Sequence, residues 1–288
     1  MVLNIIKITI FILLTGLGTV GNMFVFVNYM SMFIMEPRKK SIHLILIHLA
    51  FTNIIMLLSK GVLKTMAVFS SGNFLSDTSC KIGSYLERVA RGLSICTIAL
   101  LTGVQAITIS PGHSRWRKLK LKDPWHILPL FFFFWILNPL ISMNLIRSVL
   151  SKNTSQTSKS DPNCYFMLKL QGKNWIFLIL MGLRDTVFLG VMGGASGYMV
   201  FLLHTHHQRV LYLQNNKVYK IPPELKAVQS VLLLMLSFHF FYWTDCAISL
   251  YIIASSEKDF LAVNVHEFLG PAYAIVSPFV LIHRGTPG

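Results

Sequence analysis

The sequence predicts an all-α membrane protein: a bundle of seven transmembrane helices with an extracellular N-terminus and a cytoplasmic C-terminus. Hydrophobic residues make up 53% of the 288 residues and charged residues only 13%, about half the charged fraction of a typical soluble domain. Runs of about 20 apolar residues, long enough for a helix to cross the hydrocarbon core, recur along the chain. Lysine and arginine gather in alternate loops between these runs, which indicates the orientation.

Seven apolar runs follow one another in what we expect to be a single domain, residues 1–288. The first lacks a basic leader and a small-residue cleavage site, so we interpret it as a membrane span and not as a cleaved signal peptide. The others are each long enough to cross the membrane as a helix. The predicted spans are about 5–29, 42–67, 80–109, 126–146, 175–203, 227–253 and 262–282.

Individual spans have features that support a helical assignment. The second has Lys60 and Lys64 near its far end, and one interpretation is that their long side chains simply extend to the headgroups. The fourth contains the apolar run FFFFWIL at 131–137, typical of a lipid-facing or core surface. In the fifth, GGASG at 193–197 supplies small residues that let helices pack closely, and a hinge is the alternative interpretation.

Three features indicate the orientation. The loops after the first, third and fifth spans, together with the tail, hold more than twice as many Lys and Arg as the other loops, so we expect them to be cytoplasmic. The sequon at Asn153 falls in a predicted extracellular loop. Cys80 and Cys164 lie on that same side, where they could form a disulfide or remain free thiols.

Several functional classes lack support. The formal net charge of +15 suggests nucleic acid, but the basic residues lie in short loops and form no basic reading face, so we expect no nucleic-acid partner. No CxxC spacing, P-loop, GxSxG, HExxH or GxGxxG pattern occurs, so we expect neither an enzyme nor a cofactor. The stretch HTHHQR at 204–209 could bind a metal, but a solvated basic loop is the simpler interpretation, and we predict no metal site.

The third span contains YLERVARGLSIC, residues 85–96, with Glu87, Arg88 and Arg91 inside an otherwise apolar helix. An ionised side chain at the bilayer centre costs about 2.5–3.5 kcal/mol on insertion scales. Residues four apart share a helix face, so Glu87 and Arg91 are placed to pair within the helix. We expect this group in the outer half of the membrane.

Other spans place charges at a similar predicted depth. Intramembrane charges normally face the bundle interior or a watery cavity, so we expect an outward-open polar cavity with a ligand site. The alternative is that these residues only pair with one another and hold the helices together. The charged residues concerned are Lys60, Lys64, Arg184, Asp185, Asp245 and Glu267.

Long stretches of the chain resemble the type-1 vomeronasal receptors, a family of G-protein-coupled pheromone receptors. The resemblance runs over nearly the whole length. It is carried by HLAFTN (48–53), LLSKG (57–61), YLERVARGLSIC (85–96), QAITISP (105–111), SRWRKLK (114–120), RDTVFLGVMGGASGYMVFLL (184–203), FYW (241–243) and SPFVLIHR (277–284).

The resemblance implies a multi-pass receptor in the plasma membrane of sensory neurons of the vomeronasal or olfactory epithelium, surrounded by membrane lipids. It implies a small volatile or semi-volatile ligand, an inhibitory-class heterotrimeric G protein, a Cys80–Cys164 disulfide and glycosylation at Asn153. We expect ligand-binding residues at Glu87, Arg91, Arg184, Asp185, Asp245 and Glu267, with apolar walls from Tyr85, Phe188, Tyr242 and Trp243. We expect G-protein contacts at Arg115, Arg117, Lys118 and Lys120.

The chain departs from the broader rhodopsin-like pattern. Asn53 stands where that pattern has an aspartate, the third span ends without an Asp-Arg-Tyr triplet, and Ser277-Pro278 replaces Asn-Pro. Activation therefore cannot be copied from rhodopsin-like mechanics. Two other interpretations are a bitter-taste-type receptor, against which the stretches 85–96 and 184–203 argue, and a small transporter or channel, which would predict inverted repeats.

Overall fold

The computed structural model describes residues 2–35, 41–69, 77–111, 124–150, 175–213, 223–254 and 260–285, almost all of them helical. The helices are α1 (Val2–Met35), α2 (Ser41–Phe69), α3 (Asp77–Ile109), α4 (Leu128–Leu150), α5 (Trp175–Leu213), α6 (Pro223–Ala254) and α7 (Phe260–Gly285), with a short 3-10 helix, η2 (Pro124–Ile127), before α4.

Within these ranges, seven helices are long and apolar enough to cross a membrane. Many large apolar side chains are exposed on their outer surfaces, for example Phe132 (69% exposed), Phe201 (64%) and Phe240 (65%). So many exposed apolar side chains are unusual for a protein surrounded by water but normal for one surrounded by lipid. The predicted fold class, an all-α membrane protein with seven transmembrane helices, is confirmed. The helices extend past the predicted spans, most of all at the end of α5. Which side each terminus faces stays a prediction.

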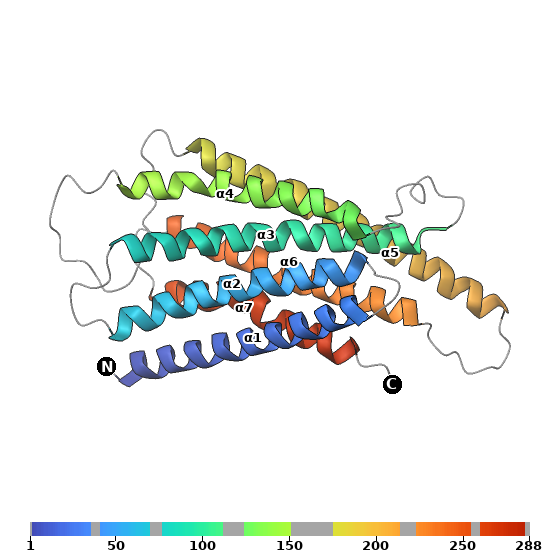
Figure 1. The fold of residues 1–288 in the computed structure, drawn as a ribbon, viewed down its shortest axis with the longest axis horizontal. Helices are drawn as coiled ribbons and strands as arrows, with labels where there is room; N and C mark the ends of the chain where they lie inside the picture. Colours follow the sequence, from blue (N-terminus) through green and yellow to red (C-terminus); the bar gives the residue numbers. More distant parts are fainter. Residues whose placement is uncertain are drawn as a thin grey trace.

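The helices lie alongside one another, with the N-terminus at one end of the bundle and the C-terminus at the other (Figure 1). Helix α3 is the central element, because it contacts α2, α4, α5 and α6. Its membrane-spanning window is 72% buried in protein, whereas that of α5 is only 22% buried. We call the end at which α1, α3, α5 and α7 begin the N-terminal end of the bundle.

A polar cluster holds α1, α2, α3 and α7 together in the interior. The missing N–H of Pro278 leaves the carbonyl of Ala274 without its usual helical partner, and the side-chain amide of Asn22 donates to that oxygen at 2.7 Å. The amide of Asn53 donates to Asn22 at 3.1 Å and to Ser277 at 2.9 Å. An uncharged amide therefore stands at the centre of this network, at the position where the rhodopsin-like pattern has an aspartate.

Helices α1 and α7 approach each other closely beside this network because two glycines leave room. A Cβ added to Gly18 would lie 3.0 Å from the backbone of Ile275, and one added to Gly21 would lie 2.9 Å from the ring of Pro278. Small residues at such a contact let helix backbones pack tightly in lipid, where no hydrophobic effect drives the association.

Candidate functional site

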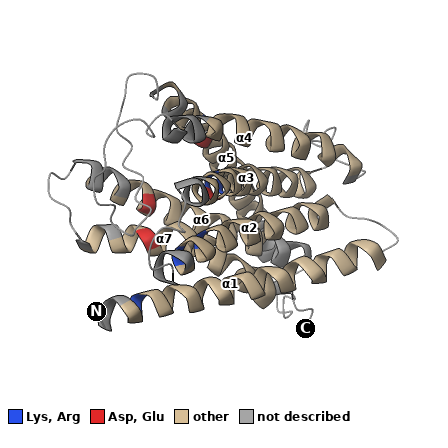
Figure 2. Cartoon of the chain, turned by 60° about the vertical axis from the view of Figure 1, so that its left-hand side comes forward, with Lys and Arg blue, Asp and Glu red and all other residues tan. Residues whose placement is uncertain are grey.

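All ten charged side chains that the structure describes lie toward the N-terminal end of the bundle, on six of the seven helices (Figure 2). Most of these side chains are joined by ion pairs between helices, so residues far apart in the sequence lie at a similar depth in the bundle. Their shared location does not test the functional roles expected for them. We call this set the charged belt. It consists of Lys7, Lys60, Lys64, Glu87, Arg88, Arg91, Arg184, Asp185, Asp245 and Glu267.

The contact between Arg91 and Asp245 ties the central helix α3 to α6. The Arg91 guanidinium lies 2.6 Å from Asp245 Oδ2, and the aspartate side chain is only 5% exposed. His266 Nε2, from α7, lies 3.5 Å from the other carboxylate oxygen. Removing one member of a buried ion pair leaves its partner charged and desolvated, at a cost of about 3–5 kcal/mol. Asp245 is therefore a junction of three helices.

A second group connects α4, α5 and α6. Arg184, whose side chain is 5% exposed, lies 2.6 Å from Asp185 on the same helix and donates to Asn138 Oδ1 at 2.9 Å. The Tyr242 hydroxyl donates to Asp185 Oδ2 at 2.9 Å. The Arg91 guanidinium lies 5.4 Å from the centre of the Tyr242 ring, within cation–π range. This contact joins the two groups into one network across α3, α4, α5, α6 and α7.

The third group ties α1, α2 and α7 together with α3. Lys60 pairs with Glu87 at 2.9 Å. Glu267 is shared by two lysines: Lys7 lies 2.8 Å from one carboxylate oxygen, and Lys64 pairs with the other. The lysines of α2 are therefore ion-pair partners inside the bundle and do not simply extend toward the headgroups.

The pairing expected within YLERVARGLSIC differs from the one found. Glu87 and Arg91 are placed one turn apart on α3, but Glu87 pairs with Lys60 of α2 and Arg91 pairs with Asp245 of α6. Helical spacing brings two residues to neighbouring positions, yet partners on adjacent helices are free to compete for them. In this bundle the charges of α3 pair with residues of α2 and α6 instead of with each other, so they connect helices.

Gly92 is part of the same arrangement. A Cβ at this position would lie 2.5 Å from Arg184 Nη1 and still closer to Asn138 Oδ1. The hydrogen bond between Arg184 and Asn138 therefore lies directly against the bare backbone of α3. No larger residue fits at position 92 without moving that bond.

The apolar residues expected in the pocket are placed unequally. Tyr85 and Phe188 pack against the main core, the Tyr85 hydroxyl donating to the Pro139 carbonyl at 3.4 Å and Phe188 contacting Phe134 edge to face. Trp243 is 61% exposed on the outer face of α6. This placement does not fit the expectation that Trp243 forms a wall of an interior pocket. The neighbouring residue, Tyr242, points into the bundle instead.

Other expected residues lie outside the described part of the chain. These are Asn153, Cys164, Arg115, Arg117, Lys118 and Lys120, and the side chain of Cys80, although its position belongs to α3. Among the described residues, no group of three or more His, Cys, Asp or Glu is arranged to hold a metal ion.

Sequence reasoning missed Lys7, Gly92 and Asn138. Lys7 carries the same signal as the other belt residues, since it is an ionised side chain inside an apolar run. Asn138 is an amide inside an apolar span, directly before Pro139. Gly92 gives no signal of its own, because its role depends on what two other helices bring against it.

Comparison with protein-family models matches residues 4–286 to the vomeronasal organ pheromone receptor family. Vomeronasal type-1 receptor 4 of Homo sapiens is 34% identical over 274 residues, which cover 93% of this chain and 90% of the relative. Vomeronasal type-1 receptor 3 of Homo sapiens is 32% identical over 93% of this chain and 87% of its own. Olfactory receptor class A-like protein 1 of Danio rerio is 28% identical, covering 96% and 88%.

Among solved structures, the chain is similar to squid rhodopsin, with a TM-score of 0.69. The match covers 95% of this chain and 80% of the rhodopsin chain at 13% sequence identity, so it concerns the fold alone.

Proposed function

The chain belongs to the vomeronasal type-1 receptor family, and from this premise we propose that it detects a small volatile or semi-volatile molecule and activates an inhibitory-class G protein. It is a multi-pass membrane receptor of the G-protein-coupled type and not an enzyme. Such a receptor has a ligand and a G protein as partners. The ligand's chemistry, the G-protein class and expression in sensory neurons of the vomeronasal or olfactory epithelium belong to the proposal.

The proposed ligand site is at the N-terminal end of the bundle, which faces the outside of the cell in our proposal. The orientation rests on the basic loops at the opposite end, the sequon at Asn153 and the cysteines at 80 and 164. Cys80 and Cys164 would form a disulfide, and Asn153 would be glycosylated. The basic stretch with Arg115, Arg117, Lys118 and Lys120 would then meet the G protein.

The observation that carries the proposal is that polar contacts hold α6 to α3 and to α5 at this end. Asp245 of α6 pairs with Arg91 of α3, and Tyr242 of α6 donates to Asp185 of α5. A ligand whose polar group competes for Arg91 or Asp185 would weaken one of these contacts. The ligand shifts the receptor toward the active state only by its differential affinity for the two states.

The consequence of releasing α6 at this end is a tilt of the helix against α3 and α5. At the opposite end we expect α5 and α6 to separate and open a surface for the G protein. No Asp-Arg-Tyr triplet ends α3, so in this proposal the contacts of α6 with Arg91 and Asp185 have the restraining role.

The test is a screen of volatile compounds on cells that display the chain, with a G-protein readout and a toxin that inactivates inhibitory-class α subunits. A toxin-sensitive response to one compound class supports the proposal. Uptake of labelled compound without any G-protein response would instead indicate a transporter.

A charge-exchange experiment distinguishes contact between Arg91 and the ligand from the ion pair between Arg91 and Asp245. We compare Arg91→Asp, Asp245→Arg and the double exchange, with surface staining as the control for display. Losing a hydrogen bond to a charged group costs about 1.5–3 kcal/mol, so we expect at least about a tenfold loss of potency for Arg91→Asp. If the double exchange restores both display and full potency, Arg91 only holds the bundle together. If it restores display alone, Arg91 contacts the ligand.

A further inference from the structure

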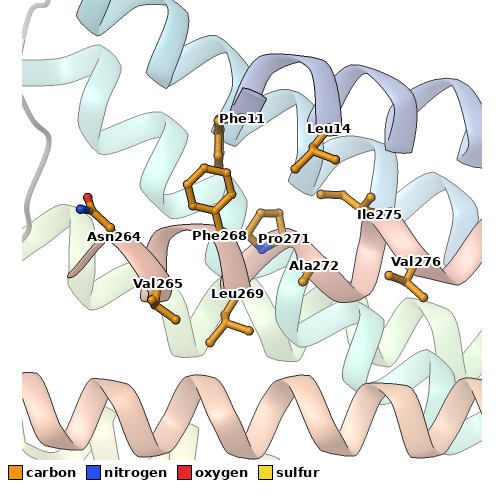
Figure 3. A pocket seen from close by; sticks show the side chains of 10 residues that line it. All are labelled: Phe11, Leu14, Asn264, Val265, Phe268, Leu269, Pro271, Ala272, Ile275 and Val276. Carbon is orange, nitrogen blue, oxygen red and sulfur yellow. The ribbon is translucent and has the colours of Figure 1, made fainter. Parts of the chain in front are cut away.

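A groove of about 460 Å³ runs between α1 and α7, next to the charged belt but outside the centre of the bundle (Figure 3). Its walls include Phe11 and Leu14 of α1 and Phe268, Pro271 and Val276 of α7. They are almost wholly apolar. The volume lies within the range of about 300–1,000 Å³ that is usual for small-molecule sites.

The groove exists because α1 and α7 diverge toward the N-terminal end. At Gly18 and Gly21 the two helices nearly touch. About two turns earlier, the rings of Phe11 and Phe268 stand between them, edge to face, with centroids 5.6 Å apart. The rings hold the two helices apart at Phe11 and Phe268, whereas the glycines let them touch at Gly18 and Gly21. The space between the helices therefore widens toward the N-terminal end of the bundle.

The groove opens toward the lipid. Leu14, on one wall, is 37% exposed and Val265, on the other, is 39% exposed, and both helices belong to the membrane-spanning set. An apolar groove at this place is filled from the hydrocarbon phase and not by water, because it offers water almost no polar partners.

The shape of the groove favours one alkyl chain. Its lining on α7 runs from Asn264 to Val276, a rise of about 18 Å at 1.5 Å per residue. A volume of about 460 Å³ spread over that length describes an elongated groove, which is the form that an extended alkyl chain fits.

The end of the groove nearest the N-terminal end of the bundle has one polar lining residue. Asn264 lines it there (Figure 3) and accepts a hydrogen bond from the Lys7 ammonium. Lys7 also lies 2.8 Å from Glu267. A cation and an amide at one end of an apolar channel match a carboxylate at the end of an alkyl chain.

We propose that this groove binds a long-chain fatty acid, with its alkyl chain along α7 and its carboxylate at Lys7 and Asn264. The site shares Lys7 with the charged belt, but it lies apart from the contacts of Arg91 and Asp185 that we propose for the receptor's ligand, and it does not depend on that proposal. The two are nonetheless coupled, because the fatty-acid carboxylate would share Lys7 with Glu267, the residue that joins α7 to Lys64 of α2.

The test uses the purified full chain in phosphatidylcholine nanodiscs and a palmitic acid that carries a photoreactive diazirine on its alkyl chain. After irradiation, labelled peptides are identified by mass spectrometry. We expect labels on residues 264–276 and 11–14 that excess palmitic acid removes. Labels spread over the lipid faces of all helices, or labels removed by cholesterol and not by palmitic acid, overturn the proposal.

Two variants probe the walls and the polar end. We expect Ala272→Phe to fill the groove and abolish labelling of residues 264–276. The matched control is Val191→Phe on α5, where Val191 is 49% exposed, and we expect it to leave this labelling unchanged. Val276→Phe replaces Ala272→Phe if the latter is not displayed. Unchanged labelling in a displayed, filled variant rejects the site.

Lys7→Gln removes the charge at the polar end. We expect it to weaken competition by palmitic acid about tenfold or more, because a charge-assisted hydrogen bond is lost. Lys7→Arg keeps the charge and should keep the affinity. Competition by hexadecanol, which has no carboxylate, should be the same in all three proteins. Equal loss for the acid and the alcohol would show that Lys7 only shapes the groove and would reject the carboxylate assignment.

Discussion

Replacing Gly92 by alanine adds one methyl group where α3, α4 and α5 meet. That methyl carbon would lie 2.5 Å from Arg184 Nη1 and still closer to Asn138 Oδ1, in conflict with the hydrogen bond of 2.9 Å between them. Arg184 is held on its other side by Asp185, so it has little freedom to withdraw. We expect Gly92→Ala to break the Arg184–Asn138 hydrogen bond.

The size of the effect follows from three contributions. Inserting a methyl group into a packed core costs about 1–3 kcal/mol, and losing a hydrogen bond to a charged group costs about 1.5–3 kcal/mol. The change from glycine to alanine inside a helix returns about 1 kcal/mol. We therefore expect a net loss of about 1.5–5 kcal/mol in the free energy of unfolding.

The assay is thermal unfolding of the purified receptor in detergent, together with surface display measured by flow cytometry. Gly103→Ala is the matched control on the same helix, because a Cβ at Gly103 would meet nothing within 4 Å. We expect the control to be as stable as the parent or up to about 1 kcal/mol more stable. Gly92→Ala should melt earlier and be displayed less.

Asn138→Ala tests whether the amide oxygen is the obstacle. It removes the atom that a Cβ at position 92 would approach most closely, so the double variant Gly92→Ala, Asn138→Ala should lose less than the sum of the two single losses. A Gly92→Ala receptor as stable as Gly103→Ala refutes the reasoning, as would strictly additive losses in the double variant.

Two further predictions concern the polar cluster and the proposed disulfide between Cys80 and Cys164. Asn22→Ala removes the nearer of two donors to the Ala274 carbonyl, at 2.7 Å, and leaves it with the Ser277 hydroxyl at 3.5 Å, so we expect a loss of about 1–3 kcal/mol in thermal unfolding experiments. Ser237→Ala, whose exposed hydroxyl donates within its own helix, is the control, and equal stability of the two variants would contradict the assignment. Cys80→Ser and Cys164→Ser should each reduce surface display to the same degree, with no further loss when combined; normal display of either variant, with Cys246→Ser as control, would disprove the disulfide.

The fold class was accessible from the sequence because hydropathy is a local property. Seven apolar runs require seven helices, since in hydrocarbon each backbone amide must find its partner within its own segment. The depth of Glu87, Arg184 and Asp245 was accessible for the same reason, because depth follows from counting residues along each run. The family could also be recognised from the sequence, because long stretches such as residues 85–96 and 184–203 resemble it.

The partners of the charged residues were not accessible in this way. Spacing within α3 suggests that Glu87 pairs with Arg91, whereas the bundle pairs them with Lys60 and Asp245. Which face of a helix turns inward depends on its rotation about its own axis. In spans that are apolar on nearly every side, the periodicity that would indicate this rotation is weak.

The sequence by itself thus determined that the chain crosses a membrane seven times and carries charges at one depth. Only the tertiary structure decided that Tyr242 points inward while Trp243 faces lipid, and that Gly92 lies against the Arg184–Asn138 hydrogen bond. It also decided that α1 and α7 diverge around an apolar groove. The physical reason is that burial in lipid acts on each span separately, whereas rotation, pairing and gaps arise only where two or more helices meet.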